Sequence, residues 1–206
     1  MKNSYLARLE KLSQSYRETK QEEERAQQRI QDSKSDYSDE GFMKIVREHE
    51  ARVHENARVF SNEVDMIQSE FNAEIKAWGT LDTTHLPSDA GLLNSGFALT
   101  QAEVNDLAVK HSGNYTMLRL LQKYCVDNRL VPPVFKSADD KMQIFAKASG
   151  NTKSLASVDT GRVLLMDLSE DLLRGILKDV DMNLDDSVTA GTSQNQPINF
   201  QFNGVR

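Results

Sequence analysis

The sequence is poor in cysteine and proline, and its hydropathy is low. It contains one cysteine and four prolines among 206 residues, and its mean hydropathy is −0.57. A single cysteine, Cys125, excludes an internal disulfide, and its apolar helical surroundings predict a buried, inert thiol. Arg8 and Glu10 interrupt the N-terminal segment, so it matches neither a signal peptide nor a transmembrane span. We therefore expect a cytoplasmic protein that does not enter membranes.

Basic charge and apolar residues are also scarce. The formal charge is −6, so the chain as a whole lacks the basic footprint of a nucleic-acid-binding protein. Only 38% of the residues are apolar and 27% are charged, which gives a thin core for a compact globule. Long helices, each buried along one stripe, accommodate this composition better. The composition thus favours an extended helical protein.

The first long helix is predicted over residues 3–32. Tyr5, Leu9, Leu12 and Tyr16 are spaced four, three and four residues apart, as in a heptad pattern. The same register continues through Glu23, but residues 21–29 are almost entirely polar. This second half is expected to face solvent or to be covered only by a partner.

A second long helix is predicted to begin after Ser38, which has the place of an N-cap, and to run from Phe42 to Trp78. It contains no proline or glycine after Phe42, so it would be about 55 Å long at 1.5 Å per residue. A short connection permits an antiparallel hairpin with the first helix, and the uncovered part of the stripe favours a homo-oligomer, a dimer or larger. The predicted self-association seam consists of Phe42, Val46, Val53, Phe60, Val64, Ile67, Phe71, Ile75 and Trp78, together with Leu9, Leu12 and Tyr16.

The remainder is predicted to be a linker, a small helical bundle and a tail. Thr100 with Glu103 forms a capping box that opens one helix, a second helix spans 115–126, and Ser137 with Asp140 opens a third that ends near Ala148. The tail is polar and is expected to be disordered, with alternating Ile198, Phe200 and Phe202 as a possible partner-binding segment. The predicted divisions are a hairpin over 1–79, a linker over 80–98, a bundle over 99–182 and a tail over 183–206.

The chemistry-bearing residues do not form a known catalytic or metal-binding pattern. His49 and His54 are five residues apart and lie about 140° apart around a helix, so they cannot share a metal ion. The acidic series from Asp179 has Leu184 where a calcium loop needs glycine and Ala190 where it needs glutamate. We predict no catalytic residues, no metal site, no cofactor and no enzymatic activity.

A DNA-binding function is the main alternative. Residues 100–128 have the length and pattern of a helix-turn-helix, with Arg119 and Lys123 on the second helix as the candidate DNA contacts. The surrounding region has only a small excess of basic residues, so nucleic acid is not the expected partner.

Four segments resemble a loosely defined group of proteins encoded among the head genes of tailed phages and prophages of Gram-positive bacteria. The matching segments are 37–41 (YSDEG), 77–78 (AW), 92–97 (LLNSGF) and 113–118 (GNYTML), within a resemblance that covers about residues 1–130. The resemblance implies a scaffold-like capsid-assembly protein that is a self-associating coiled coil and contacts the major capsid protein through one end of its chain. Scaffolding proteins usually make this contact with a basic helical C-terminus, and the nearly neutral segment at Phe200 and Phe202 departs from that pattern.

These observations predict an all-α fold with a long N-terminal helical hairpin or coiled coil, a small bundle and a disordered tail. The expected function is phage capsid assembly, with the capsid protein as the partner. A DNA-binding regulator and a minor virion structural protein are the alternatives.

Overall fold

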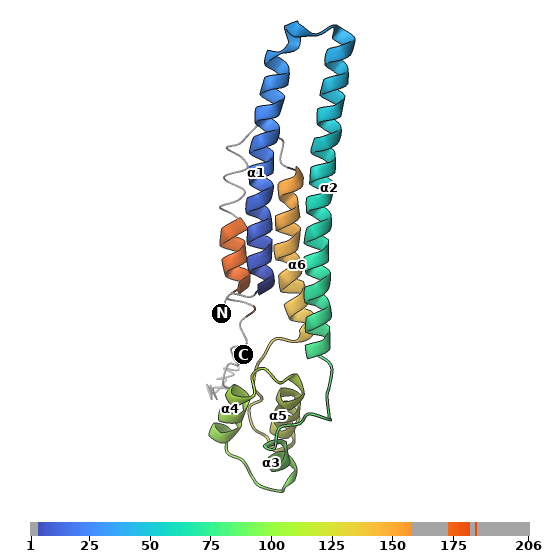
Figure 1. The fold of residues 1–206 in the computed structure, drawn as a ribbon. Helices are drawn as coiled ribbons and strands as arrows, with labels where there is room; N and C mark the ends of the chain where they lie inside the picture. Colours follow the sequence, from blue (N-terminus) through green and yellow to red (C-terminus); the bar gives the residue numbers. More distant parts are fainter. Residues whose placement is uncertain (1–3, 158–172, 182–183, 185–206) are drawn as a thin grey trace, which may run out of the picture. The chain divides into compact units, whose positions relative to one another are not determined.

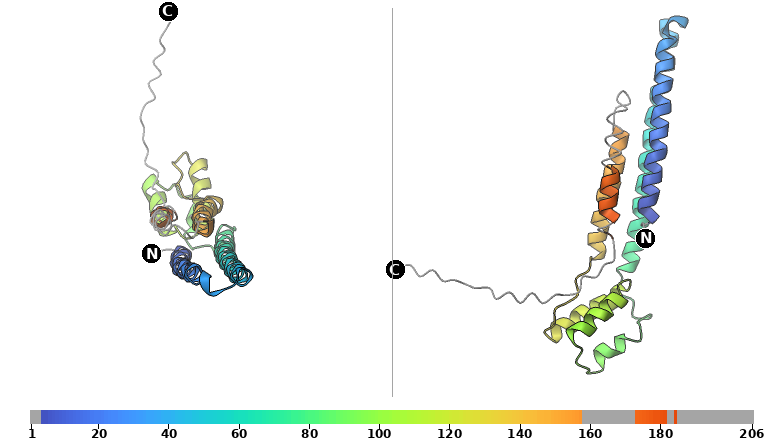
Figure 2. Two further views of the ribbon diagram at one scale, coloured as in Figure 1. Left: turned by 90° about the horizontal axis from the view of Figure 1, so that it is seen from above. Right: turned by 90° about the vertical axis from the view of Figure 1, so that its left-hand side faces the viewer.

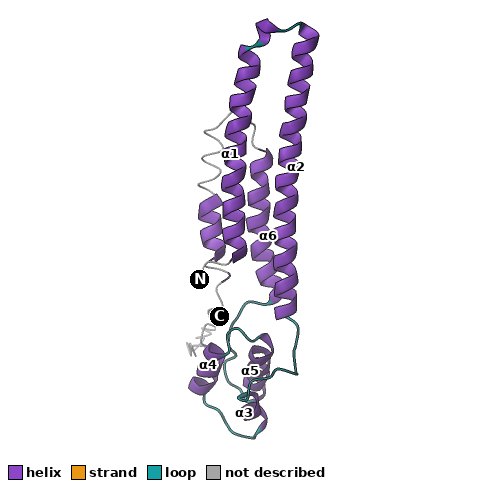
Figure 3. Cartoon of the chain, viewed as in Figure 1, coloured by secondary structure: helices purple, strands orange, loops and turns teal. Residues whose placement is uncertain are grey.

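The computed structural model describes residues 4–157, 173–181 and 184. Within these residues the fold is all-α, with helices joined by loops and no β-strand (Figure 3). The described residues divide into two compact units, the first formed by residues 4–78, 137–157, 173–181 and 184 and the second by residues 79–136. The first unit therefore combines two segments that are far apart in the sequence.

Two long helices form the body of the first unit, in an antiparallel hairpin (Figure 1). They are α1 (Ser4–Asp32) and α2 (Asp39–Trp78), joined through the short 3-10 helix η1 (Lys34–Asp36). The Tyr5 hydroxyl donates to the Glu74 carboxylate at 2.6 Å, and the Asn56 amide donates to Glu23 at 2.8 Å. The start of α1 therefore lies beside the end of α2. With 40 residues, α2 is about 60 Å long at the usual rise.

The predicted start of α2 is confirmed. The Ser38 hydroxyl accepts a hydrogen bond from the backbone N–H of Gly41 at 3.3 Å, as an N-cap does. Asp39 and Glu40 occupy the first turn, where their negative charge complements the positive end of the helix dipole. These local contacts fix where the hairpin turn ends and the second helix begins.

A second layer packs against the hairpin. It consists of α6 (Ala138–Ser154), which continues into the 3-10 helix η2 (Leu155–Ser157), and of a helix over residues 173–181 (Figure 2). The Phe145 ring stacks on Phe71 with ring centroids 4.0 Å apart, and Tyr5 contacts both rings edge-on. The core of the unit includes Leu6, Leu9, Tyr16, Phe60, Val64, Ile67, Phe71, Phe145, Ala148, Leu155, Leu173, Leu177, Val180 and Leu184.

The second unit has a smaller core around α5. Its helices are α3 (Ala90–Asn94), α4 (Gln101–Lys110) and α5 (Tyr115–Asp127). The predicted capping box of Thr100 and Glu103 is present at the start of α4. The core includes Ala90, Val104, Ala108, Met117, Leu118, Leu121, Tyr124 and Cys125. Cys125 is buried, as predicted, and burial raises the pKa of its thiol.

The structure corrects the predicted divisions of the chain. Residues 99–182 are not one bundle, because α6 packs on α1 and α2 in the first unit while α4 and α5 belong to the second. Residues 80–98 are not a plain linker, since they include α3 and the buried Ala90. The Asp82 backbone N–H also donates to the Thr116 hydroxyl of α5 at 2.8 Å. The apolar stripe of α6 finds its partner on α2, which the linear order of the helices does not reveal.

Candidate functional site

The hairpin continues beyond the second layer of the first unit. Lys141, near the start of α6, lies over Trp78 at the end of α2, and Lys153, near the end of α6, pairs with Asp65. Thus α6 runs alongside only the last part of α2, and Figure 1 shows α1 and α2 extending well past its end. We call this extension, residues 20–56, the distal hairpin.

A buried polar layer lies at the base of the distal hairpin. Lys20 and Glu23 of α1 are only 4% and 5% exposed, and their charged groups are 3.2 Å apart. Glu23 also accepts the hydrogen bond from Asn56 of α2. The sequence places Glu23 in the apolar register of α1. Residues 21–29 were predicted to face solvent or a partner, and that prediction missed this buried polar layer.

An aromatic stack lies next to this layer. The rings of Tyr16 and Phe60 are parallel within 12°, with centroids 4.0 Å apart, and Lys20 Nζ lies 5.4 Å from the Tyr16 ring centroid. Burial is the main cause that raises the pKa of Tyr16. This stack joins the two helices where the polar layer begins.

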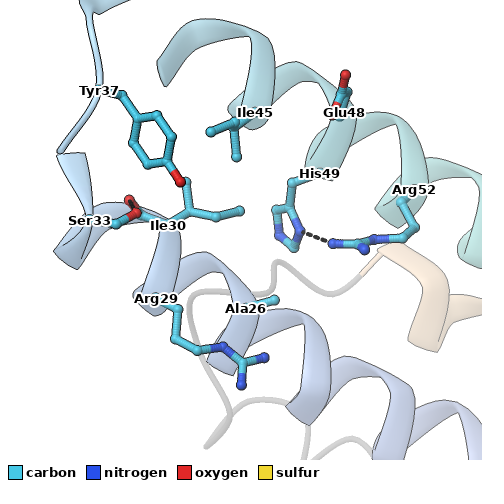
Figure 4. A pocket seen from close by; sticks show the side chains of 9 residues that line it. All are labelled: Ala26, Arg29, Ile30, Ser33, Tyr37, Ile45, Glu48, His49 and Arg52. Atoms are coloured by element: carbon cyan, nitrogen blue, oxygen red, sulfur yellow. Dashed lines mark hydrogen bonds between the residues drawn. The ribbon is translucent and has the colours of Figure 1, made fainter. Parts of the chain in front are cut away.

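A hollow opens near the tip of the distal hairpin, between α1 and α2 (Figure 4). Its volume is about 370 Å³. Apolar and aromatic side chains line one part of it, and polar side chains line the rest. The first set is Ala26, Ile30, Tyr37 and Ile45, and the second is Arg29, Ser33, Glu48, His49 and Arg52. Glu48 pairs with Lys44 at 4.0 Å. We call this feature the tip hollow. Neither arginine forms an ion pair with any carboxylate of the described residues.

The contact between Arg52 and His49 shows which nitrogen of the histidine ring accepts a hydrogen bond. A guanidinium nitrogen of Arg52 lies 3.1 Å from Nδ1 of the largely buried His49. A guanidinium has no acceptor atom, so His49 Nδ1 accepts the hydrogen bond and any ring proton sits on Nε2. This hydrogen bond holds the Arg52 guanidinium beside the His49 ring at the tip hollow.

The predicted self-association seam is divided between the core and the distal hairpin. Seven of its side chains are buried. All of these except Phe42 pack in the core of the first unit, between helices of the same chain. The buried members are Leu9, Tyr16, Phe42, Phe60, Val64, Ile67 and Phe71, and the half-buried ones are Leu12, Val46, Val53, Ile75 and Trp78. The proximal seam is therefore largely internal core, whereas Val46 and Val53 of the distal hairpin are half-buried and lie past the end of α6.

The predicted DNA contacts lie on the outer face of α5. Arg119 donates to Gln122 at 3.1 Å, and Lys123 pairs with Asp127 at 2.9 Å. Both side chains are exposed, but the Lys123 charge is balanced within its own helix. The other predicted contact segment, Ile198, Phe200 and Phe202, lies outside the described residues.

Two further titratable clusters are hydrogen-bond networks in the second unit. Asp89 accepts from Lys110 at 2.7 Å and contacts His111 at 2.8 Å, and these two bonds lower the pKa of its carboxyl. Hydrogen bonds from Thr84 and then His85 lower the pKa of Asp82. In the described part of the chain, no three or more His, Cys, Asp and Glu side chains come together to hold a metal ion. None of the described helices is long and apolar enough to cross a membrane.

Comparison of the chain with protein-family models, curated proteins and solved structures gave no match.

Proposed function

We propose that this chain is a non-enzymatic assembly protein, a scaffold-like component of tailed-phage capsid assembly that associates with copies of itself. The observation that carries the proposal is the distal hairpin, which extends past α6 with Ile30, Ile45, Val46 and Val53 only half-buried, although Phe42 is buried. A two-helix hairpin is marginal by itself, because helices gain most of their stability from covering an apolar face. A second copy of the chain would supply that cover. The resemblance of residues 37–41, 92–97 and 113–118 to phage head-gene proteins adds the biological setting.

Contact with the capsid protein is the second half of the proposal, and the second unit is its candidate site. Phe97 is 68% exposed there, and Val126 of α5 is exposed to the same extent. Contiguous exposed apolar patches are typical of surfaces that bind other proteins, and we propose that Phe97 and Val126 belong to such a patch. We expect Phe97→Ser and Val126→Ser to weaken capture of the capsid protein while leaving self-association unchanged.

Light scattering coupled to size exclusion tests the first half of the proposal. We expect a dimer or larger species whose mass falls on dilution, because the distal hairpin is short and its contacts are few. A monomer at every concentration would remove the proposed self-association. Co-expression with the major capsid protein then tests assembly. A scaffold is lost on maturation, whereas a minor virion component persists, so the amount of chain in mature particles distinguishes these two roles.

A further inference from the structure

The end of the distal hairpin has two regions of opposite charge. At the turn, Asp36, Asp39 and Glu40 are exposed and form what we call the acidic cap. Neither Asp39 nor Glu40 forms an ion pair with a basic group of the described residues. Farther along the hairpin, the tip hollow presents Arg29 and Arg52, which also lack carboxylate partners there. Lys44 and Arg47 line the same surface as Asp39 and Glu40, and Lys44 pairs with Glu48. The segment thus has acidic side chains without ion pairs at the turn and two arginines without ion pairs farther along.

These two regions are spaced so that they can pair with those of a second hairpin. Thirteen residues of one continuous helix separate Asp39 from Arg52, which corresponds to about 20 Å along α2. If two tips overlap antiparallel by that length, the acidic cap of each copy lies level with the tip hollow of the other. A twofold arrangement makes both contacts at once, because each surface then meets its complement.

Apolar side chains accompany the charges. Met43 is 47% exposed beside the acidic cap, whereas Tyr37, which is 49% exposed, lines the tip hollow with the half-buried Ile30 and Ile45. The overlap that pairs the charges also brings Met43 of one copy near Tyr37, Ile30 and Ile45 in the tip hollow of the other. Burial of these side chains would add affinity, while the charges would set the direction and register of the overlap.

We propose that the tip of the hairpin is a self-association surface in which the acidic cap of one copy docks on the tip hollow of a second copy, and reciprocally. This inference rests on the proposed function, because it locates the self-association that the function requires. The interface is small, so one contact is weak and reversible, as repeated contacts in an assembling particle need to be.

Charge reversal tests the proposal by sedimentation velocity on the full chain. One variant carries Arg29→Glu with Arg52→Glu, and another carries Asp39→Lys with Glu40→Lys. Each variant alone sets like charges against each other in both contacts of a homodimer, so we expect its association to weaken by about tenfold or more. An equimolar mixture of the two variants restores opposite charges in both contacts, so we expect a mixed dimer to form.

The control carries Arg119→Glu with Lys123→Glu in the second unit, which changes the net charge by as much as the first variant does. We expect it to associate like the wild type. Circular dichroism should show that all three variants have the same helix content as the wild type. If the wild type associates and the reversals do not weaken it, or if mixing does not restore association, the tip is not the interface although self-association stands. A wild type that remains monomeric would overturn both this inference and the proposed function.

Discussion

The ammonium group of Lys141 lies 3.9 Å from the centroid of the Trp78 ring, and only 5% of the lysine is exposed. This cation–π contact joins the first turns of α6 to the last residue of α2. Trp78 was expected to belong to a seam between copies of the chain. In the structure a lysine of the same chain covers it, and this contact is one of those that attach α6 to the first unit.

Replacing Lys141 with alanine should loosen that attachment. We expect Lys141→Ala to lower the free energy of unfolding by about 1–2 kcal/mol, because the ring loses both the ammonium and the packed lysine stem. Trp78 is the only tryptophan, so its fluorescence reports on this site, and its emission should move to longer wavelength in the folded variant. Lys147→Ala, on an exposed part of α6, is the control and should change stability by less than about 0.5 kcal/mol.

Removal of the Phe71 ring should destabilise the chain equally at all protein concentrations. Phe71 is 1% exposed and stacks on Phe145 of the same chain, so we expect Phe71→Ala to cost about 3–5 kcal/mol. Urea unfolding at two well-separated protein concentrations provides the measurement. Met66→Ala, at an exposed position of α2, is the matched control. If high protein concentration rescued the Phe71 variant, Phe71 would instead belong to an interface between copies.

The helices and their starts could be predicted because they depend on local contacts. Ser38, Thr100 and Ser137 each receive a hydrogen bond from a backbone N–H three residues ahead, and this pattern is visible in the sequence. The predicted end of α6 near Ala148 was wrong, since the helix continues to Ser154. The buried Thr152 and Leu155 explain the extension, because packing beyond Gly150 outweighs the low helix propensity of glycine.

The packing of helices on one another could not be predicted from the sequence. The spacing of apolar residues shows that α2 and α6 each have an apolar stripe. It does not show that Phe145 stacks on Phe71, which is 74 residues away in the sequence. The tip hollow was missed for the same reason. Arg29 and Arg52 lie on different helices, and only the register of the hairpin brings them to one hollow.

Glycine at position 129 should stabilise the second unit. Arg129 has a backbone φ of 58°, in the left-handed region that costs most residues about 1 kcal/mol and glycine almost nothing. The residue follows α5, where the Leu130 N–H donates to the Cys125 carbonyl at 2.8 Å and closes the helix end. We expect Arg129→Gly to raise stability by about 1 kcal/mol in calorimetry. Lys123→Gly, within α5, should instead lower it by about the same amount.

Acid should weaken the second unit partly through Asp89. Hydrogen bonds from Lys110 and then His111 hold the pKa of the Asp89 carboxyl below its ordinary value of 3.8. A carboxyl whose pKa is lowered by folding stabilises the folded state at pH values above its ordinary pKa. This contribution is lost as the pH falls through the lower pKa of the folded state. We expect Asp89→Asn to be less stable than the wild type at pH 7 and to lose less stability below about pH 4. Asp106→Asn, at an exposed position of α4, should leave the acid dependence unchanged.

The polar layer at the base of the distal hairpin should show strongly non-additive substitutions. Glu23→Leu alone leaves the Lys20 ammonium buried without its carboxylate and the Asn56 amide without its acceptor. We expect that single change to cost about 3–5 kcal/mol, since an uncompensated buried charge is more costly than a missing ion pair. Lys20→Met combined with Glu23→Leu removes both charges and should recover most of that loss.

A double-mutant cycle by urea unfolding measures this coupling. The paired exposed residues Glu55 and Arg58 of α2 supply the control cycle, because their contact is solvated and should couple by less than about 1 kcal/mol. Strong coupling at Lys20 and Glu23 would mean that the two charges of α1 are buried as a compensated pair, which leaves the Asn56–Glu23 hydrogen bond as the contact of the layer that joins the two helices. Coupling no larger than in the control would mean that the Lys20–Glu23 pair contributes no more to stability than a solvated surface pair.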